Sequence, residues 1–202
     1  MTLTLADLLA FNAVLLAALA APGAAMLYCL KTTVSSGPAT GMATGLGLGT
    51  AAAIWTLCAL LGLETVFAVF PWTYAALKFG GALYLIWIAI HTWRHAHAAL
   101  GAAPKPHGRA ILSGLLLNLS NPKSMLFAAA VIVVVFPQGL QPRDIALIVL
   151  NHWVLELAFY AVLSALLGAP APRRWYLGLK PVLDRTAATL LGAFGLRLLL
   201  EK

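Results

Sequence analysis

Six apolar runs, each long enough to cross a membrane as a helix, are the dominant feature of this chain of 202 residues. Roughly 20 apolar residues span the hydrocarbon core of a bilayer, and the intervals between the runs are too short for a soluble domain. With 62% hydrophobic and 9% charged residues, the composition is also a poor fit to a soluble globular protein. We therefore predict an all-α integral membrane protein with six transmembrane helices, at residues 3–30, 41–63, 74–93, 110–136, 145–168 and 182–200.

The positive charges are divided unevenly between the two sets of connections. The net charge is +7, but in a membrane protein the sidedness of Lys and Arg matters more than the sum, so we expect no nucleic-acid partner. The connections after the first, third and fifth runs carry eight cations against four on the other side. The positive-inside rule then predicts that these connections are cytoplasmic and that both termini lie outside. The eight are Lys31, Arg94, Lys105, Arg109, Arg173, Arg174, Lys180 and Arg185; the four are Lys78, Arg143, Arg197 and Lys202.

The two halves of the chain resemble each other at three places, and the spacing between the matches grows as loop insertions would make it grow. Three spans per repeat is an odd number, so the second copy enters the membrane from the opposite face. This predicts two inverted three-helix repeats, at 1–93 and 110–202, joined by a basic linker at 94–109. The matches are PGAAMLY at 22–28 with NPKSMLF at 121–127, LCALLG at 57–62 with LSALLG at 163–168, and GGALYL at 80–85 with LGAFGL at 191–196.

The fourth run contains a helix breaker and a cation in its middle. Pro122 cannot donate to the carbonyl of Asn118 and disfavours helical geometry at Asn121. We predict a break there, with Asn121 as N-cap and Pro122 as the first residue of a new half-helix. The start of a helix attracts anions, and Lys123 adds a full charge about 20 Å deep. A cation at the bilayer centre costs about 2.5 to 3.5 kcal/mol, so it needs a partner or a water-filled cavity.

Glu156 in the fifth run is the candidate partner of Lys123. It lies about 18 Å from the other face, which is a comparable depth. His152 lies one turn earlier on the same face, and this couple can pass protons or hold a substrate ammonium group. By the repeat offset, Glu156 corresponds to Thr50, so the predicted site is symmetric in backbone and asymmetric in charge.

Pro22 and Gly23 predict a matching break in the first run. A simpler interpretation is that Pro22 and Pro122 only kink their helices, while Lys123 and Glu156 form a structural ion pair. The surrounding polar side chains exceed what one pair requires, and this favours a water-filled cavity. They are Asn118, Ser120, Asn121, Asn151 and His152.

The other motifs predict packing rather than chemistry. His91 and His95 have metal-ligand spacing, but no Cys or carboxylate nearby completes a site, and we favour a solvated basic segment. Gly41, Gly45 and Gly49 form a ladder typical of close helix packing within or between subunits. The sequence contains no nucleophile and base pair, phosphate loop or dinucleotide fingerprint, so we expect neither an enzyme nor a cofactor.

The run NLSNPKSMLF, the segment LKFGGALYLIWIAIHTWR and the break at Pro22 and Gly23 resemble the LysE/RhtB family of bacterial amino-acid exporters over essentially the whole chain. The resemblance implies a multi-pass protein of the bacterial inner membrane. It also implies export of amino acids such as lysine, arginine, threonine, homoserine or its lactone, with protons as the coupling ion. Pro22, Gly23, Asn121, Pro122 and Lys123 match the motif positions of the family.

Two positions depart from the family pattern. Ala24 follows Pro22 and Gly23 where Pro or Ser is common, and Thr50 stands where many relatives carry an acid. A basic substrate would favour more carboxylates than Glu156 alone provides, so we expect a neutral amino acid or a derivative.

We therefore predict a secondary transporter, whose substrate carboxylate binds at Asn121 and Lys123 and whose substrate ammonium binds near Glu156. A homodimer is plausible, with the glycine ladder as one candidate contact. Export of a metal cation and a purely structural membrane subunit are alternatives. Another alternative is a membrane thiol-disulfide electron carrier of the DsbD-like type. That carrier needs a cysteine in both first helices, whereas Cys29 maps by the repeat offset to Ala128, and both Cys29 and Cys58 are expected to be packing residues.

Overall fold

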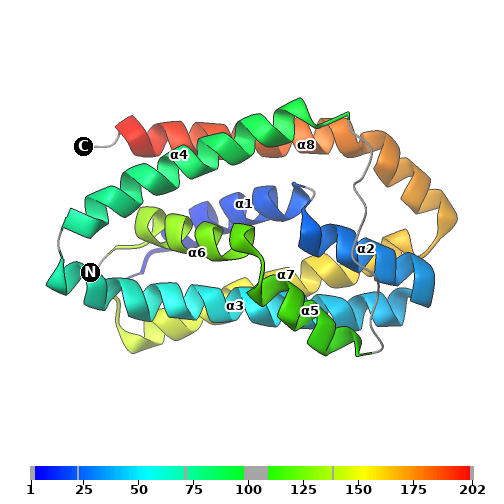
Figure 1. Ribbon diagram of the computed structural model, residues 1–202, viewed down its shortest axis with the longest axis horizontal. Helices are drawn as coiled ribbons and strands as arrows, with labels where there is room; N and C mark the ends of the chain where they lie inside the picture. The colour runs from blue at the N-terminus through cyan, green and yellow to red at the C-terminus, as the bar shows by residue number, and fades with distance from the viewer. Residues whose placement is uncertain (1–2, 22, 71, 98–108, 138, 201–202) are drawn as a thin grey trace.

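The computed structural model describes residues 3–21, 23–70, 72–97, 109–137 and 139–200. Within these residues the regular structure is entirely helical (Figure 1). The eight helices of this part of the chain are α1 (Leu5–Ala20), α2 (Ala24–Ser36), α3 (Pro38–Val69), α4 (Trp72–Arg94), α5 (Ala110–Leu119), α6 (Pro122–Val135), α7 (Pro142–Leu167) and α8 (Pro170–Leu200).

Two of the expected spans are each built from two helices that meet at a bend. The bend is 60° between α1 and α2, and 62° between α5 and α6. Helix α6 begins at Pro122 with Asn121 as its N-cap, and α1 ends at Ala20, two residues before Pro22. A proline removes one donor from the helical ladder and crowds the preceding turn, which explains why both bends lie at these positions. The predicted breaks in the first and fourth runs are confirmed.

The described residues contain up to four candidate membrane spans. Pro38–Gly62 of α3 and Pro142–Leu167 of α7 are each long and apolar enough to cross, and each bent pair counts as one further candidate. The finding supports an all-helical membrane protein, while the count of six crossings stays a prediction.

The helices run between two opposite ends of the molecule (Figure 1). Helix α4 packs along α8, and α3 packs along both α5 and α7, while α1 and α6 lie between these groups. Both chain ends and the junctions α3–α4 and α6–α7 lie at one end, and the junctions α2–α3 and α7–α8 lie at the other. Counting each bent pair as one segment, successive segments therefore alternate in direction.

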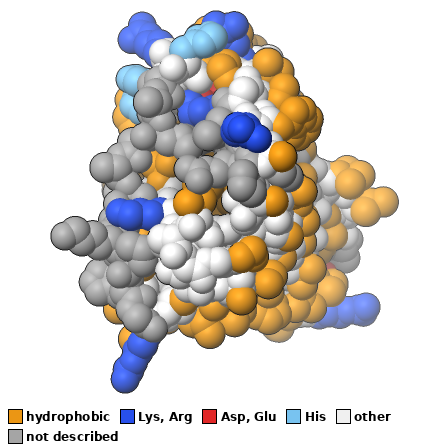
Figure 2. Space-filling view, turned by 90° about the vertical axis from the view of Figure 1, so that its right-hand side faces the viewer, with side chains coloured by type: hydrophobic (Ala, Val, Ile, Leu, Met, Phe, Trp, Pro, Cys, Tyr) orange, Lys and Arg blue, Asp and Glu red, His pale blue; other side chains and the backbone are white. Residues whose placement is uncertain are grey.

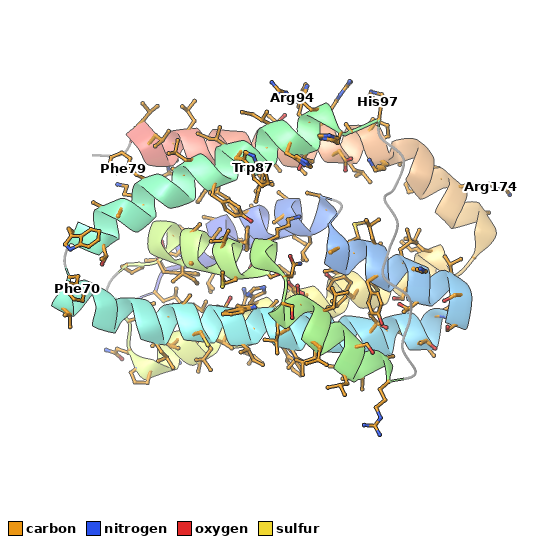
Figure 3. The ribbon with its side chains drawn as sticks, in the orientation of Figure 1. Phe70, Phe79, Trp87, Arg94, His97 and Arg174 are labelled. Carbon is orange, nitrogen blue, oxygen red and sulfur yellow. The ribbon has the colours of Figure 1, made fainter. Side chains whose placement is uncertain are left out.

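Cations gather at the end that holds the α2–α3 and α7–α8 junctions. Arg94, His97 and Arg174 lie toward this end, whereas Phe70 and Phe79 lie toward the other (Figure 3). Figure 2 looks onto the cationic end, where Lys and Arg side chains surround the face and hydrophobic side chains cover the flank. The described parts of the expected cytoplasmic connections therefore lie toward one end of the molecule, although the side of the membrane stays a prediction.

The main core joins both halves of the chain. Phe11, Leu85, Val131 and Leu191 come from α1, α4, α6 and α8, and each is at most 1% exposed. Because lipid is as apolar as these side chains, close packing rather than exclusion from water holds such helices together.

The glycine ladder of α3 packs inside the molecule and does not leave a face for a second copy. Gly41 packs against Thr33 and Ser164, and Gly45 against Tyr160, so closely that an added Cβ would collide with them. The small residues let α3 approach α2 and α7, as expected for packing within a subunit. The candidate dimer contact on this ladder is therefore wrong.

The stretch 169–181, expected as a connection, forms the first part of α8. Helix α8 begins at Pro170, because proline fits the first turn of a helix, where the missing donor is not needed. The helix continues through Pro181 in its interior. The prediction that Lys180 is a loop cation is wrong. Lys180 is only 7% exposed and its Nζ lies 2.8 Å from Oδ2 of Asp184.

Candidate functional site

A cavity of about 60 Å³ lies where the two bent pairs approach each other. It has room for a few water-sized groups. Both breaks contribute to its wall, and α7 contributes acidic and basic side chains. The predicted site residues in the lining are Gly23, Asn118, Asn121, Lys123, His152 and Glu156, and Ser124 and Tyr160 add two hydroxyl groups. The structure thus brings six of the predicted site residues together.

Lys123 joins the two breaks. It belongs to the first turn of α6, yet its Nζ donates to the carbonyls of Ala18 at 3.2 Å and Ala21 at 3.1 Å, at the end of α1. The last carbonyls of a helix form the negative end of its dipole, so the ammonium stabilises that end. An ammonium has three protons, and these two bonds leave one for another acceptor.

The start of α6 satisfies its own donors. Oδ1 of Asn121 accepts from the amide of Lys123 at 3.1 Å, and the carbonyl of Asn121 accepts from the amide of Ser124 at 3.1 Å. Pro122 has no amide proton. The anion site expected from the α6 amides is therefore already filled by the protein.

The start of α2 is different, because its N-cap is Gly23 and no side-chain bond caps it. A Cβ added to Gly23 would lie 3.4 Å from Nζ of Lys123, so the ammonium lies directly beside this helix end. The positive end of the α2 dipole and the Lys123 charge act at one place. The sequence predicted the positive potential at the start of α6, whereas in the structure it lies at the start of α2.

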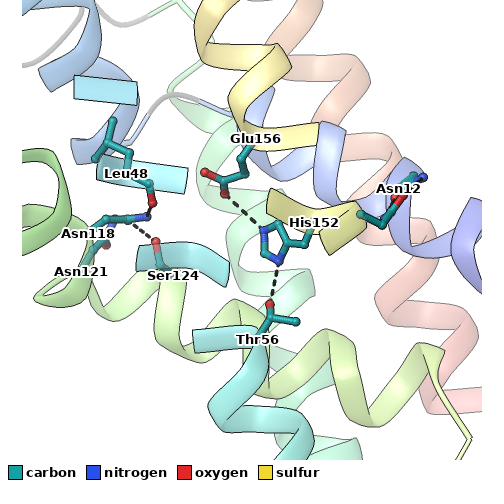
Figure 4. A network of polar contacts seen from close by, with 9 residues as sticks. Asn12, Leu48, Thr56, Asn118, Asn121, Ser124, His152 and Glu156 are labelled. Carbon is teal, nitrogen blue, oxygen red and sulfur yellow. Dashed lines mark hydrogen bonds and ion pairs between the residues drawn. The ribbon is translucent and has the colours of Figure 1, made fainter. Parts of the chain in front are cut away.

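Glu156 supplies the acidic group of the cavity. Its Oε1 lies 3.4 Å from Nε2 of His152, and Nδ1 of the same ring lies 2.7 Å from the Thr56 hydroxyl (Figure 4). With a neutral ring, the Thr56 hydroxyl donates to Nδ1 and Nε2–H donates to the carboxylate. Glu156 is 5% exposed and its Oε2 has no hydrogen-bond partner among the described residues. A buried, unpaired carboxylate oxygen is costly unless a ligand reaches it.

Asn118 fixes the break between α5 and α6 to α3. Its Nδ2 donates to the carbonyl of Leu48 at 2.8 Å, and its Oδ1 accepts from Ser124 at 2.5 Å and Asn121 at 3.2 Å (Figure 4). The amide thus uses one donor and both acceptor positions on the protein. Asn118 positions the backbone of the site and has little capacity left for a ligand.

Three predicted site residues lie elsewhere or are only partly described. Thr50 lies outside the cavity, since its hydroxyl donates to the carbonyl of Leu46 at 2.7 Å and accepts from Nε1 of Trp153 at 3.2 Å. Pro22 lies outside the described residues, and Pro122 is described only as the first residue of α6. The structure does not bring Lys123 and Glu156 into a direct ion pair: they share the cavity and each bonds to other groups.

Sequence reasoning missed three contributors to this region. Thr56 carries no motif, so its bond to His152 is visible only in the structure. Gly49 lies against Glu156, where an added Cβ would stand 3.2 Å from the Cβ of that residue. Asp184 lies inside the predicted sixth span, whereas Lys180 was assigned to the connection before it, so their spacing of four, which is typical of an ion pair on a helix, was missed.

The histidines and cysteines behind the alternative chemistries lie outside the cavity lining. The rings of His91 and His95 stack with centroids 4.2 Å apart, and no group of three His, Cys, Asp or Glu side chains with metal-binding geometry occurs in this part of the chain. Cys29 is buried and Cys58 exposed, and both are free thiols.

An all-helical membrane protein with a charged internal cavity between broken helices is the class defined by this fold and site. The family model for the LysE type translocator matches residues 16–202. The chain therefore belongs to the LysE family of translocators, which confirms the resemblance found in the sequence.

Several individual relatives are named as efflux proteins. A threonine efflux protein of Salmonella typhi is 31% identical over 196 residues, covering 92% of this chain and 93% of the relative, and one of Escherichia coli K12 is 30% identical with the same coverage. A homoserine/homoserine lactone efflux protein of Salmonella typhimurium is 33% identical over 126 residues, covering 61% of this chain and 59% of the relative. No solved structure matches the chain.

Proposed function

We propose that this chain is a secondary transporter that exports a neutral amino acid or a close derivative, of the threonine and homoserine type, from the cytoplasm. One observation carries the proposal. The internal cavity presents the Lys123 ammonium beside the uncapped start of α2, and separately an unpaired oxygen of Glu156. A zwitterion carries one charge of each sign, so it complements both groups at once. The names of the relatives agree with such a substrate.

In the proposed complex the substrate carboxylate accepts from Lys123 and from the first amides of α2. The substrate ammonium donates to Oε2 of Glu156, which His152 orients through Oε1. Glu156 is the one carboxylate in the lining, and the α-ammonium uses it. A second amino group on a basic substrate would stay unpaired in the cavity, which is costly, and this favours neutral substrates.

Transport would follow from rocking of two inverted repeats, at 1–93 and 110–202, about this cavity. Two features support the repeat: each half contains one bent pair, and the segments alternate in direction. The cationic end of the molecule would face the cytoplasm and the termini the opposite side of a bacterial inner membrane, with protons as the coupling ion. Movement of an unchanged substrate needs no catalytic residue. The oligomeric state, including a homodimer, is open to direct measurement.

The proposal is tested with purified protein in liposomes loaded with radiolabelled threonine, homoserine or lysine. We expect efflux of the first two and little of lysine. In Glu156→Gln, we expect both efflux and exchange of internal for external substrate to fall by about 100-fold or more, because an ammonium loses its charged acceptor. Wild-type transport by Glu156→Gln, or equal transport of lysine, would contradict the proposed binding mode.

A further inference from the structure

A second buried carboxylate lies on α8, outside the cavity lining, and is not used by the proposed substrate. Asp184 of α8 is 2% exposed, and its Oδ2 accepts from Nζ of Lys180 at 2.8 Å. Its other oxygen, Oδ1, has no hydrogen-bond partner among the described residues. Only Oε2 of Glu156 shares this condition in the described part of the chain. The interior therefore holds two carboxylates that each have one oxygen paired and one free.

The cations show a parallel arrangement. Lys180 also donates to the carbonyls of Ala96 at 3.1 Å and His95 at 3.4 Å, at the end of the α4 segment. Lys123 is held in the same way by carbonyls at the end of α1. The two positive charges of Lys123 and Lys180 equal the two negative charges of Glu156 and Asp184. This group of side chains is therefore neutral overall when all four are charged and the His152 ring is neutral. A zwitterion keeps this balance, whereas a bound proton changes it.

The charged groups that act on Asp184 are few. They are Lys180 on its own helix and Lys123 from α6. From α4 the described contacts reach the Lys180 ammonium through backbone carbonyls. In turn, the two acids that act on the Lys123 ammonium are Asp184 and Glu156. Lys123 thus lies under the influence of both carboxylates, and of these two only Glu156 lines the cavity.

We propose that Asp184 carries the coupling proton of this transporter, while Glu156 binds the substrate ammonium. This assignment rests on the proposed export function and divides the two roles that the sequence left on the Glu156 and His152 couple. One proton binds the Asp184 carboxylate to give the neutral acid, and the same proton is released on the other side of the membrane.

The coupling follows from competition for Glu156. When Asp184 is neutral, Glu156 is the remaining anion that acts on Lys123, so the Lys123 ammonium competes with the substrate ammonium for it. The proton-bound form then binds substrate more weakly, and bound substrate in turn favours the charged form of Asp184. Such mutual weakening couples the movement of a proton to the opposite movement of an amino acid. Pro181, between Lys180 and Asp184, removes one hydrogen bond of α8 at this position and lets the helix bend when the ion pair breaks.

The test compares proton-driven efflux with substrate exchange in liposomes, using threonine as the probe. Asp184→Asn imitates the neutral acid. We expect it to lose stimulation of efflux by an imposed pH gradient and to lose threonine-dependent proton movement, measured with a pH-sensitive dye. Exchange at saturating threonine should stay within about threefold of wild type, while the half-saturating concentration rises about tenfold, because the Lys123 ammonium competes with the substrate ammonium for Glu156. Wild-type affinity should increase with pH, and that of the variant should not.

A double variant separates coupling from structure. Lys180→Met with Asp184→Asn removes both charges and keeps the interior neutral, so it is the protein to use if the single variant fails to insert. A structural ion pair can be replaced by neutral groups without loss, so full proton coupling in the double variant would overturn the proposal. Loss of exchange together with coupling in an inserted protein would overturn it as well. Asp144→Asn, at the start of α7, is the matched control and should behave as wild type.

The outcomes also separate this inference from the export function. If wild-type protein neither exchanges nor releases threonine or homoserine, the export function fails. If wild type transports and Asp184→Asn still responds fully to the pH gradient, only the assignment of Asp184 fails.

Discussion

The two half-helices that begin in the interior, α2 and α6, have the same backbone origin and different chemistry. Both follow a proline-containing break and both open on the same cavity. Asn121 caps α6 with its own side chain, whereas Gly23 leaves α2 without a side-chain cap. The difference teaches that a broken helix is not by itself a binding site. The start of α6, which its own N-cap satisfies, stabilises the fold. The start of α2, beside the Lys123 ammonium, is open to a ligand.

The charge asymmetry between the halves has a related meaning. Lys123 belongs to α6, in the second half, but bonds carbonyls at the end of α1 in the first. The second half thus supplies the cation for the break that has none of its own. Substitutions at the two breaks should therefore have different effects, which can be ordered by size.

The largest effect is expected for Lys123→Met, which removes the charge and keeps the length of the side chain. Loss of a charge-assisted bond to a carboxylate costs about 3 kcal/mol, or roughly 100-fold in substrate affinity. The carbonyls of Ala18 and Ala21 also lose their donor, so some loss of thermal stability is expected. Binding of threonine by purified protein and efflux from liposomes measure the effect.

Arg143→Met is the matched control for Lys123→Met, because Arg143 is an exposed cation at the start of α7. It should bind and transport as wild type. If Lys123→Met keeps wild-type affinity, the positive potential beside α2 has no role in binding.

A sharper test of the comparison is Gly23→Asp, which gives α2 the kind of cap that α6 already has. The φ of −141° and ψ of −179° at Gly23 suit any residue, and an added Cβ meets Lys123 at ordinary contact distance. The new carboxylate would cap α2 and pair with Lys123, thereby imitating a bound substrate. We expect equal or higher thermal stability and a loss of efflux of about 30-fold or more, since a built-in carboxylate competes with the substrate's at high effective concentration.

Gly23→Ala is the partner control for Gly23→Asp. It adds the same Cβ without the charge, so efflux should stay within about threefold of wild type. If both variants lose efflux equally, steric closure rather than occupation of the anion site explains the result.

These differences also show what the sequence can and cannot predict. Pro122 and Asn121 fixed the position of the α6 break, because proline and N-cap chemistry act locally within a few residues. The shared depth of Lys123 and Glu156 followed from helical rise alone, and both residues line the cavity. The direction in which each side chain points around the helix axis could not be predicted from the sequence. Thr50 is adjacent to Gly49, yet Gly49 faces Glu156 and Thr50 does not.

The position of the anion site depended on tertiary contacts that no local pattern encodes. The Lys123 side chain turns to the end of α1, more than 100 positions away in sequence. The α8 boundary was missed for a different reason: prolines were interpreted as the end of structure when Pro170 starts a helix. That error hid the Lys180 and Asp184 pair.

A smaller effect is expected for Asn121→Ala, and it should appear in stability rather than in binding. The substitution removes the cap of α6 and one bond to Asn118. Loss of an N-cap costs about 1 kcal/mol, so the thermal midpoint should fall by a few degrees. Affinity for threonine should change by less than about fivefold, since the amides of α6 are not the ligand. Asn121→Asp, which keeps the cap, should restore most of the stability. A large loss of affinity with unchanged stability would place the anion site at α6 after all.

The smallest effect is expected for Thr50→Val, although the repeat pattern pairs Thr50 with Glu156. Its hydroxyl bonds Leu46 and Trp153 outside the cavity, so an isosteric valine should leave threonine affinity unchanged within about twofold. Thr56→Val makes the same chemical change about 1.7 turns along α3, at the residue that bonds His152 at 2.7 Å. There the imidazole loses its Nδ1 partner, its hold on Glu156 weakens, and affinity should fall by about fivefold to tenfold. The contrast between two threonines on one helix therefore tests which face of α3 belongs to the site, and equal effects at both positions would reject this assignment.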